Sequence, residues 1–143
     1  MKYLIEVLIE KPLDVVIREI RSKEAALKWI EGLESFELIE GELDTVGSKY
    51  LMRFLNKGKS SEMTETITGF NPPRDITTVY EMSGVWNECI NMFEPVEGKT
   101  LYKMHTTFKF SGVMGLFIWL FKPIFKKQTK SGMVAFKEYC EQL

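Results

Sequence analysis

The sequence predicts an α+β protein in which an antiparallel sheet packs against one long C-terminal helix. From residue 33 to residue 110, short runs of alternating apolar and polar side chains are separated by turn residues, which is typical of strands. From residue 112 to the C-terminus, apolar residues recur at helical spacing. A sheet and a helix each have an apolar face to bury, so we expect these two elements to cover one another.

Length and composition restrict the class of protein. A chain of 143 residues predicts one domain, 1–143, with a sizeable core. The 19 basic and 20 acidic residues leave a net charge of -1, so we expect no nucleic-acid partner. The N-terminus lacks a signal-peptide pattern, and the apolar run 113–121 is shorter than the roughly 20 residues that span a bilayer, which predicts a cytoplasmic protein. Cys89 and Cys140 have no metal-ligand spacing, and free thiols are the simpler interpretation.

The first strand and two short helices open the chain. Residues 2–10 alternate apolar and polar side chains and predict a half-buried strand. Residues 13–21 have helical spacing after Pro12, which suits a first helical turn. Ser22 is a good N-cap for a second short helix that carries Trp29, and Gly32 is suited to end it.

Six further strands are expected at 36–43, 49–55, 61–70, 76–82, 86–94 and 100–110. The turn between the second and third of these, Asn56-Lys57-Gly58-Lys59, has hairpin composition, and Asn71-Pro72-Pro73-Arg74 is a firm break. Consecutive strands joined by short turns predict an antiparallel meander.

Strand alternation also predicts which side chains face the helix. The expected inward face comprises Tyr50, Met52, Phe54, Met63, Ile67, Tyr80, Met82, Met104, Thr106 and Phe108. These side chains form either a solid core or the lining of a cavity. His105, the only histidine, falls on the opposite face, which argues against a catalytic role.

Glu65 is the polar residue of interest because it shares the face of Met63 and Ile67. If that face is inward, burial raises the pKa of the carboxyl group, which could then act as a general acid or bind a ligand. Two alternatives stay open, namely that Glu65 lies at the open end of the pocket and that the register is the opposite one, with the threonine face inside. For residues 86–94, the sequence does not decide which face is inward.

The C-terminal segment has two parts. Residues 113–125 are apolar nearly all round, and Lys122-Pro123 should kink or restart the helix. After it, an apolar stripe includes Phe125, Thr129, Met133 and Phe136, beside Gly132. The outer side of 113–121 needs a cover, which could be a partner chain, a membrane or the short helices around Trp29. The nearby lysines Lys122, Lys126, Lys127 and Lys130 form either a membrane-contact patch or a solvated face.

The order of one strand, two short helices, six strands and a long helix resembles the helix-grip architecture of the START-like, or Bet v 1-like, superfamily. This superfamily includes polyketide cyclase/dehydrase-like and coenzyme-Q-binding relatives. The supporting local cues are Ile9-Glu10-Lys11-Pro12-Leu13-Asp14-Val15-Val16, Trp29-Ile30-Glu31-Gly32-Leu33, Gly41 with Val46-Gly47-Ser48, Asn71-Pro72-Pro73-Arg74, and Phe93-Glu94-Pro95 with Gly98-Lys99-Thr100. The resemblance implies a curved seven-stranded sheet gripping the C-terminal helix, with an apolar cavity between them.

The resemblance also implies a function, namely binding of an apolar or amphipathic small molecule as a carrier or sensor. Since the sequence shows no nucleophile arrangement and no metal-ligand spacing, we expect no catalytic residue, metal or cofactor, and an enzyme is less favoured. The expected ligand-binding residues are Trp29, Tyr50, Met52, Phe54, Met63, Glu65, Ile67, Tyr80, Met82, Met104, Thr106, Phe108, Phe121, Phe125, Thr129, Gly132, Met133 and Phe136. Three alternatives stay open. They are a polyketide-cyclase-type enzyme in the same cavity, a lipid-transfer or membrane-docking protein gated by residues 113–125, and a homodimer formed through residues 113–125.

Overall fold

The computed structural model describes the backbone of residues 1–143 and every side chain except those of Met114 and Phe117. The seven strands form one antiparallel sheet in the order β1-β7-β6-β5-β4-β3-β2. The strands are β1 (Lys2–Ile9), β2 (Leu33–Glu40), β3 (Lys49–Asn56), β4 (Lys59–Asn71), β5 (Asp75–Met82), β6 (Val85–Val96) and β7 (Lys99–Phe110); the helices are α1 (Leu13–Ile20), α2 (Lys23–Trp29), α3 (Met114–Phe117), the 3₁₀ helix η1 (Ile118–Phe121) and α4 (Lys122–Glu141). The predicted helix-grip architecture is confirmed.

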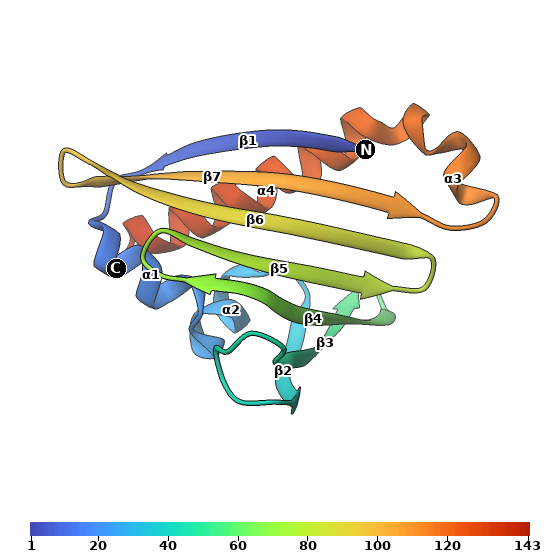
Figure 1. The fold of residues 1–143 in the computed structure, drawn as a ribbon, viewed down its shortest axis with the longest axis horizontal. Coiled ribbons are helices and arrows are strands. Elements are labelled where there is room, and N and C mark those ends of the chain that lie inside the picture. The colour runs from blue at the N-terminus through green and yellow to red at the C-terminus, as the bar shows by residue number, and fades with distance from the viewer.

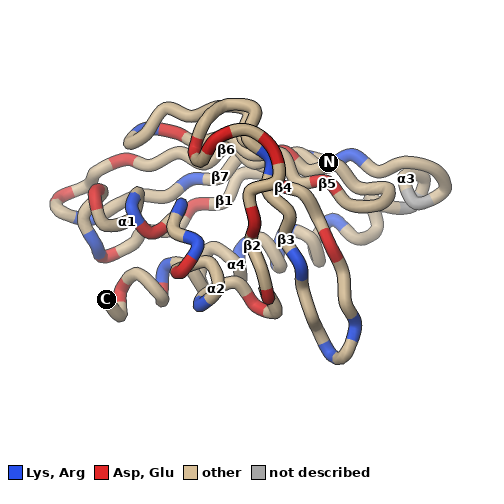
Figure 2. The backbone as a smooth tube through the Cα atoms, turned by 90° about the horizontal axis from the view of Figure 1, so that it is seen from below, with Lys and Arg blue, Asp and Glu red and all other residues tan. Residues whose placement is uncertain are grey.

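The sheet curves around α4, and α1 and α2 lie at the end of the sheet where α4 ends (Figures 1 and 2). The interior contains two separate clusters of buried apolar side chains. One joins β1, α1, β6 and β7 to α4 and is centred on residues such as Ile9, Tyr102 and Phe136. The other joins α2 to β2, β3 and β4 and includes Phe36 and Tyr50. This division leaves room between the clusters for a cavity.

Local sequence explains the predicted turns. In the β3–β4 hairpin, Lys57 and Gly58 both have positive φ, 51° and 78°, as the two central residues of a type I′ turn require. The Ser22 side chain accepts a hydrogen bond from the Ala25 amide at 3.1 Å and caps α2, as predicted. Gly32 adopts a φ of +77°, which turns the chain into β2 after α2 has ended at Trp29.

Two predicted boundaries are corrected. The strand expected at 36–43 is β2, Leu33–Glu40, because Leu33 already pairs with Phe54 directly after the Gly32 turn. Its predicted end is replaced by a loop that begins at Gly41, whose φ is +76°. The predicted restart near Pro123 is confirmed, since α4 begins at Lys122 with the proline in its first turn.

Several of the described apolar side chains before α4 are exposed to solvent. The two short helices around Trp29 do not cover them, because these helices pack at the other end of α4 and Trp29 contacts Phe136 there. The side chain of Trp119 is 70% exposed. Among the described residues, no helix has the length and apolar character that crossing a bilayer requires.

Candidate functional site

The inward face of the sheet and the inner side of α4 enclose a cavity with three adjoining compartments. The inner compartment, about 100 Å³, lies between α2, β4 and β5 and is partly polar. The outer compartment, about 410 Å³, lies between the start of α4 and the β5–β6 turn. The helix compartment, about 190 Å³, follows α4 from Gln128 to Phe136. Trp29 lines all three compartments and stands at their junction.

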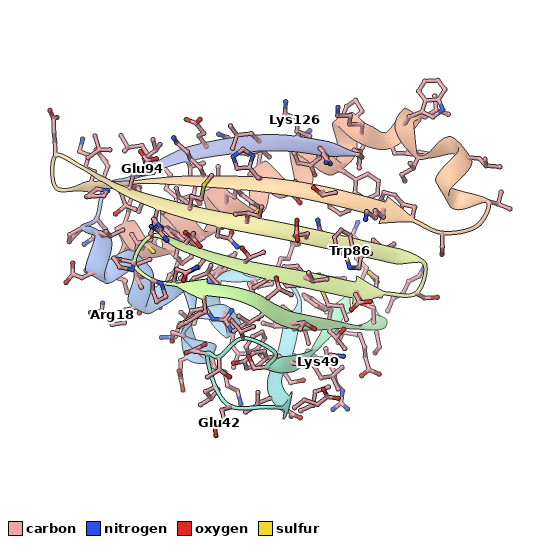
Figure 3. The ribbon with its side chains drawn as sticks, viewed as in Figure 1. Arg18, Glu42, Lys49, Trp86, Glu94 and Lys126 are labelled. Carbon is pink, nitrogen blue, oxygen red and sulfur yellow. The ribbon has the colours of Figure 1, made fainter. Side chains whose placement is uncertain are left out.

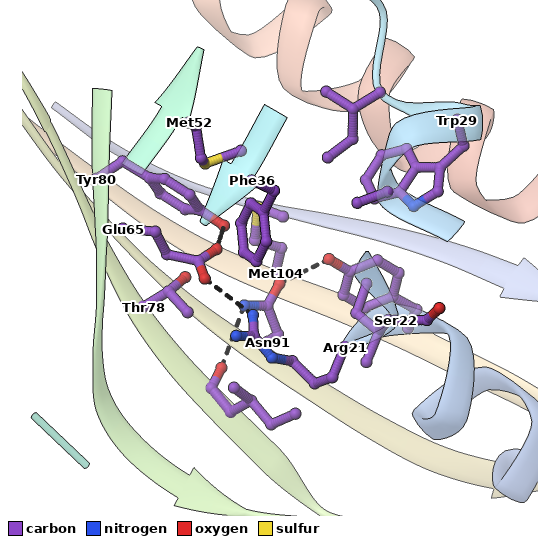
Figure 4. Close-up of a pocket in the computed structure, with 15 residues that line it drawn as sticks. Arg21, Ser22, Trp29, Phe36, Met52, Glu65, Thr78, Tyr80, Asn91 and Met104 are labelled. Carbon is purple, nitrogen blue, oxygen red and sulfur yellow. Dashed lines mark hydrogen bonds and ion pairs between the residues drawn. The ribbon is translucent and has the colours of Figure 1, made fainter. Parts of the chain in front are cut away.

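A buried ion pair anchors the inner compartment. Glu65 is 3% exposed, which confirms that its face of β4 is inward. Its Oε1 accepts a hydrogen bond from Arg21 Nη1 at 3.0 Å, and its Oε2 accepts one from the Tyr80 hydroxyl at 2.6 Å. Figure 4 shows the carboxylate held between these two side chains. Both oxygens of Glu65 therefore already have a partner.

Arg21 is the centre of this network. Its Nε donates to Asp44 Oδ1 at 3.1 Å, and its guanidinium carbon lies 5.3 Å from the centre of the Tyr50 ring. Burial lowers the pKa of Arg21, but the carboxylates of Glu65 and Asp44 outweigh that effect and hold the pKa above its ordinary value. Burial, and then the neighbouring Glu65 charge, raise the pKa of Tyr80 well above its ordinary value. Tyr80 therefore keeps its proton at physiological pH and donates a hydrogen bond to Glu65.

A second polar pair lies on β6 and β7. The Tyr102 hydroxyl donates to Asn91 Oδ1 at 2.6 Å, and Asn91 Nδ2 donates to the carbonyl of Ile76 at 3.1 Å. On the same face, Asn87 Nδ2 donates to Thr106 Oγ1 at 2.7 Å. The sequence left the orientation of residues 86–94 open, and the structure places Asn87, Cys89 and Asn91 inside.

Two buried polar atoms at the cavity remain unpartnered. Trp29 Nε1 has no hydrogen-bond partner among the residues that the structure describes, and Thr78 Oγ1 makes no hydrogen bond of good geometry, although it lies close enough to the Tyr80 hydroxyl to oppose the rise in the pKa of Tyr80. Both residues line the inner compartment, and Thr78 is only 2% exposed. An unsatisfied buried polar group costs about 1–3 kcal/mol, so each of these atoms favours a partner that enters the cavity.

The outer compartment is mainly apolar. Met63 and Phe108 from the sheet face Phe125 of α4 across it, and Phe125 packs at a centroid distance of 5.4 Å from Phe108. Met82 and Gln128 stand at its rim and are exposed to solvent. The cavity thus combines an apolar outer part with a polar inner end.

Most of the residues predicted for the site line this cavity. They are Trp29, Met52, Met63, Glu65, Tyr80, Met82, Met104, Thr106, Phe108, Phe125, Thr129, Gly132, Met133 and Phe136. A Cβ added to Gly132 would meet no atom within 4 Å, so this glycine borders open space.

Four predicted site residues do not line any of the three compartments. Ile67 is fully buried and packs in the α2–β4 cluster, where Phe54 is also partly buried. Tyr50 stacks on Phe36 at 4.9 Å, and its hydroxyl accepts a hydrogen bond from the Asp44 amide at 2.9 Å. Phe121 ends η1 and is 47% exposed. Tyr50, Phe54 and Ile67 pack within that cluster without reaching the cavity, although other members such as Phe36 and Met52 line the inner compartment, and Phe121 is exposed to solvent.

Arg21, Thr78, Asn91 and Tyr102 line the cavity but were not among the predicted site residues. Thr78 and Tyr102 carry a signal in their strand alternation, since they share the faces of Tyr80 and Met104. Arg21 carries none, because it lies between two helices and reaches Glu65 only through the fold. His105 is exposed on the outer face, as predicted. Among the described residues, no group of three or more His, Cys, Asp or Glu side chains is placed to hold a metal ion.

Cys89 is a buried thiol rather than an activated nucleophile. Burial raises its pKa from 9.0 to about 11. The unfolded chain loses this proton first, so the thiol's contribution to stability is complete below pH 9 and falls as the pH rises toward 11. We expect iodoacetamide near neutral pH to leave Cys89 unmodified in the folded protein and to label it in urea, as read by peptide mass spectrometry. Rapid labelling of the folded protein would contradict this description of the thiol.

Comparison with known proteins identifies the fold. The architecture and its cavity define a helix-grip protein, and solved structures agree. No protein-family model and no curated protein sequence matches the chain. The crystal structure of Ara h 8.0201 superposes with a TM-score of 0.82 at 16% identity, covering 100% of this chain and 99% of that one. The chain therefore has the Bet v 1-like helix-grip fold.

Two further structures share this fold. The di-domain ARO/CYC protein BexL, from the BE-7585A biosynthetic pathway, gives a TM-score of 0.80 at 16% identity. The match covers 99% of this chain and 46% of BexL, so the chain spans about half of that protein. An uncharacterised protein from Rhizobium leguminosarum gives 0.74 at 17% identity, with 100% of this chain and 95% of that one covered. At these identities the comparisons establish the fold alone.

Proposed function

We propose that this protein binds an amphipathic small molecule between the sheet and α4, as a carrier or sensor. The observation that carries the proposal is the pair of buried, unpartnered polar atoms, Trp29 Nε1 and Thr78 Oγ1, at the inner end of an apolar cavity. Ligand sites in proteins are mostly apolar cavities with a few placed polar groups, and this cavity has that composition.

The geometry suggests the chemistry of the ligand. An apolar body suits the 410 Å³ outer compartment between Met63, Phe108 and Phe125. An oxygen that accepts a hydrogen bond from Trp29 Nε1 suits the inner end, where Thr78 offers a hydroxyl that can donate or accept. The ligand class is therefore a mainly apolar molecule with a carbonyl or hydroxyl oxygen at one end.

A cyclase-type enzyme is the second candidate, and one observation favours it. Glu65 and Tyr80 converge on the inner compartment, as the acid and base of such an enzyme would. The structurally similar BexL is described as an ARO/CYC protein. Against this, Arg21 and Tyr80 already occupy both oxygens of Glu65, and the raised pKa of Tyr80 makes it a poor acid. The unpartnered atoms belong to Trp29 and Thr78, which cannot serve as acid or base, so binding is the better-supported function.

Replacing Thr78 by valine separates stability from binding. Valine keeps the shape and strand preference of threonine but removes the unpartnered oxygen, so we expect the ligand-free protein to be as stable as the parent or about 1 kcal/mol more stable. The ligand loses a hydrogen bond, and its affinity should fall about threefold to tenfold. Urea unfolding and a ligand titration measure the two effects. A clear loss of stability without ligand would show that Thr78 is already satisfied.

A titration with the amphipathic dye 1-anilinonaphthalene-8-sulfonate tests the proposed function. The side chain of Gly132→Leu would extend into the open space beside α4 and occupy the cavity, while Trp119→Ala alters only an exposed surface. We expect one dye per protein, at least tenfold weaker binding to the Gly132→Leu variant, and unchanged binding to the Trp119→Ala variant. Dye binding that Trp119→Ala abolishes and Gly132→Leu leaves intact would place the dye outside the cavity and argue against the proposal.

A further inference from the structure

The segment that precedes α4 presents apolar side chains to solvent. Of the described side chains in 113–124, six large apolar ones are exposed. They are Val113, Leu116, Trp119, Leu120, Phe121 and Ile124, and we call them the α3–η1 surface. Scattered exposed apolar residues are normal, but six large ones within twelve residues indicate an interaction site.

The position of this surface gives it access to a large partner. The helices α3 and η1 project beyond the end of the sheet, past the N-terminus of β1 (Figure 1). One turn after Phe121, the side chain of Phe125 lines the outer compartment and packs between Phe108 and Phe110. The α3–η1 surface is therefore continuous along the chain with a wall of the cavity.

A basic cluster adjoins the surface. Lys126, Lys127 and Lys130 line one shallow groove with Pro123 against β1. Figure 3 shows Lys126 at this edge of the molecule, pointing outward. Lys130 Nζ donates to the backbone carbonyl of Glu6 at 3.0 Å. Among the residues that line the groove, Glu6 is the acidic one.

The charge of this region differs from that of the chain as a whole. The sequence from Lys99 to Lys137 contains no Asp or Glu, although the whole chain has a net charge of -1. Lys122 lies between the apolar residues and the groove lysines. Positive charge is therefore concentrated next to the exposed apolar side chains, and the sequence around these lysines contains no acidic residue that would neutralise it.

We propose that the α3–η1 surface docks on the face of an anionic phospholipid bilayer. Trp119 and its apolar neighbours enter the interfacial layer, and the lysines from Lys122 to Lys130 contact anionic headgroups. Apolar side chains flanked by lysines bind bilayers in this way, and tryptophan is favoured at the headgroup level.

A second copy of the chain fits this region less well. In a two-fold symmetric contact the same patch meets itself, so the lysines of each copy would face the lysines of the other. The like charges oppose that contact, whereas an anionic surface attracts all of them. Docking on a bilayer does not require a ligand in the cavity, so this proposal can be tested independently of the proposed function.

Co-sedimentation of the full chain with vesicles tests the proposal. The protein is mixed at low salt with vesicles of phosphatidylglycerol and phosphatidylcholine, or with vesicles of phosphatidylcholine alone. We expect binding to the anionic vesicles and far weaker binding to the neutral ones. Each lysine near an anionic surface raises the vesicle-binding constant about fivefold. Lys126→Glu with Lys127→Glu should therefore lower that constant by more than about 25-fold. Leu116→Ser with Trp119→Ser should also abolish it.

The matched control is Lys23→Glu with Lys28→Glu, which makes the same change of charge on exposed positions of α2, at the other end of the molecule. This variant should bind anionic vesicles nearly as well as the parent protein. Two results would overturn the proposal directly: no binding to anionic vesicles at low salt, or equal losses of binding in the α2 control and the α4 variant. The proposal would also be overturned if the protein does not bind vesicles but forms a dimer, and Leu116→Ser with Trp119→Ser dissociates that dimer. The last result would assign the surface to a second copy of the chain.

Discussion

Replacing Arg21 by alanine is expected to lower the free energy of unfolding by about 3–5 kcal/mol, because it leaves the Glu65 carboxylate buried without its countercharge. Both partners of this ion pair lie inside the protein, and the pair is 3.0 Å long. The substitution also removes the hydrogen bond to Asp44, which holds the loop after β2 against α2. Urea unfolding followed by far-UV circular dichroism measures the change.

Two comparisons separate the buried pair from ordinary surface charge. Arg53 and Glu62 form an exposed pair across β3 and β4 at 3.3 Å, and Arg53→Ala should cost no more than about 1 kcal/mol. Removing both buried charges, with Arg21→Met and Glu65→Met together, should recover much of the loss caused by Arg21→Ala. If Arg21→Ala costs no more than Arg53→Ala, the inner network does not hold the fold together.

Phe136→Ala is expected to destabilise the protein by about 3–5 kcal/mol. Phe136 is 0% exposed and contacts both the sheet and α2. Its ring lies 5.1 Å from Trp29 and 6.1 Å from Tyr102. Because Phe136 also lines the helix compartment, the truncation should enlarge the cavity as well as loosen the helix.

The matched control for this substitution is Phe121→Ala, which removes the same side chain from a 47% exposed position. Surface truncation of this kind usually changes stability by less than about 0.5 kcal/mol. Thermal unfolding of the two variants should therefore separate widely. Similar melting temperatures for both would mean that α4 is not held by the contacts around Phe136.

Alternation along the strands was sufficient to predict the sheet and the direction of most inward side chains. The reason is physical, since successive side chains on a strand point to opposite faces and burial marks one of them. For Glu65, parity with Met63 and Ile67 predicted only a shared face, and the buried position of the carboxyl group came from the structure. For residues 86–94 the same method failed, because polar residues such as Asn87 and Asn91 occupy the inner face.

Long-range polar pairing could not be predicted. Arg21 reaches Glu65 across 44 positions of sequence, and neither residue carries a local pattern that names the other. The extent of the cavity could not be predicted from the sequence either. Tyr50, Met52, Met63 and Ile67 share the inward face and one cluster, yet Met52 and Met63 border the cavity and Tyr50 and Ile67 do not. Packing between distant elements, and not strand parity, decides that difference.

Native mass spectrometry of the protein, purified gently from a cellular lysate, shows directly whether a small molecule is bound in the cavity. We expect a second peak series that carries the mass of one bound molecule, lost on denaturation and strongly reduced in the Gly132→Leu variant. Extraction and fragmentation of that molecule should reveal a mainly apolar compound with a carbonyl or hydroxyl oxygen at one end. A protein that is always recovered empty, and that also binds no amphipathic probe within the cavity, would contradict the proposed function.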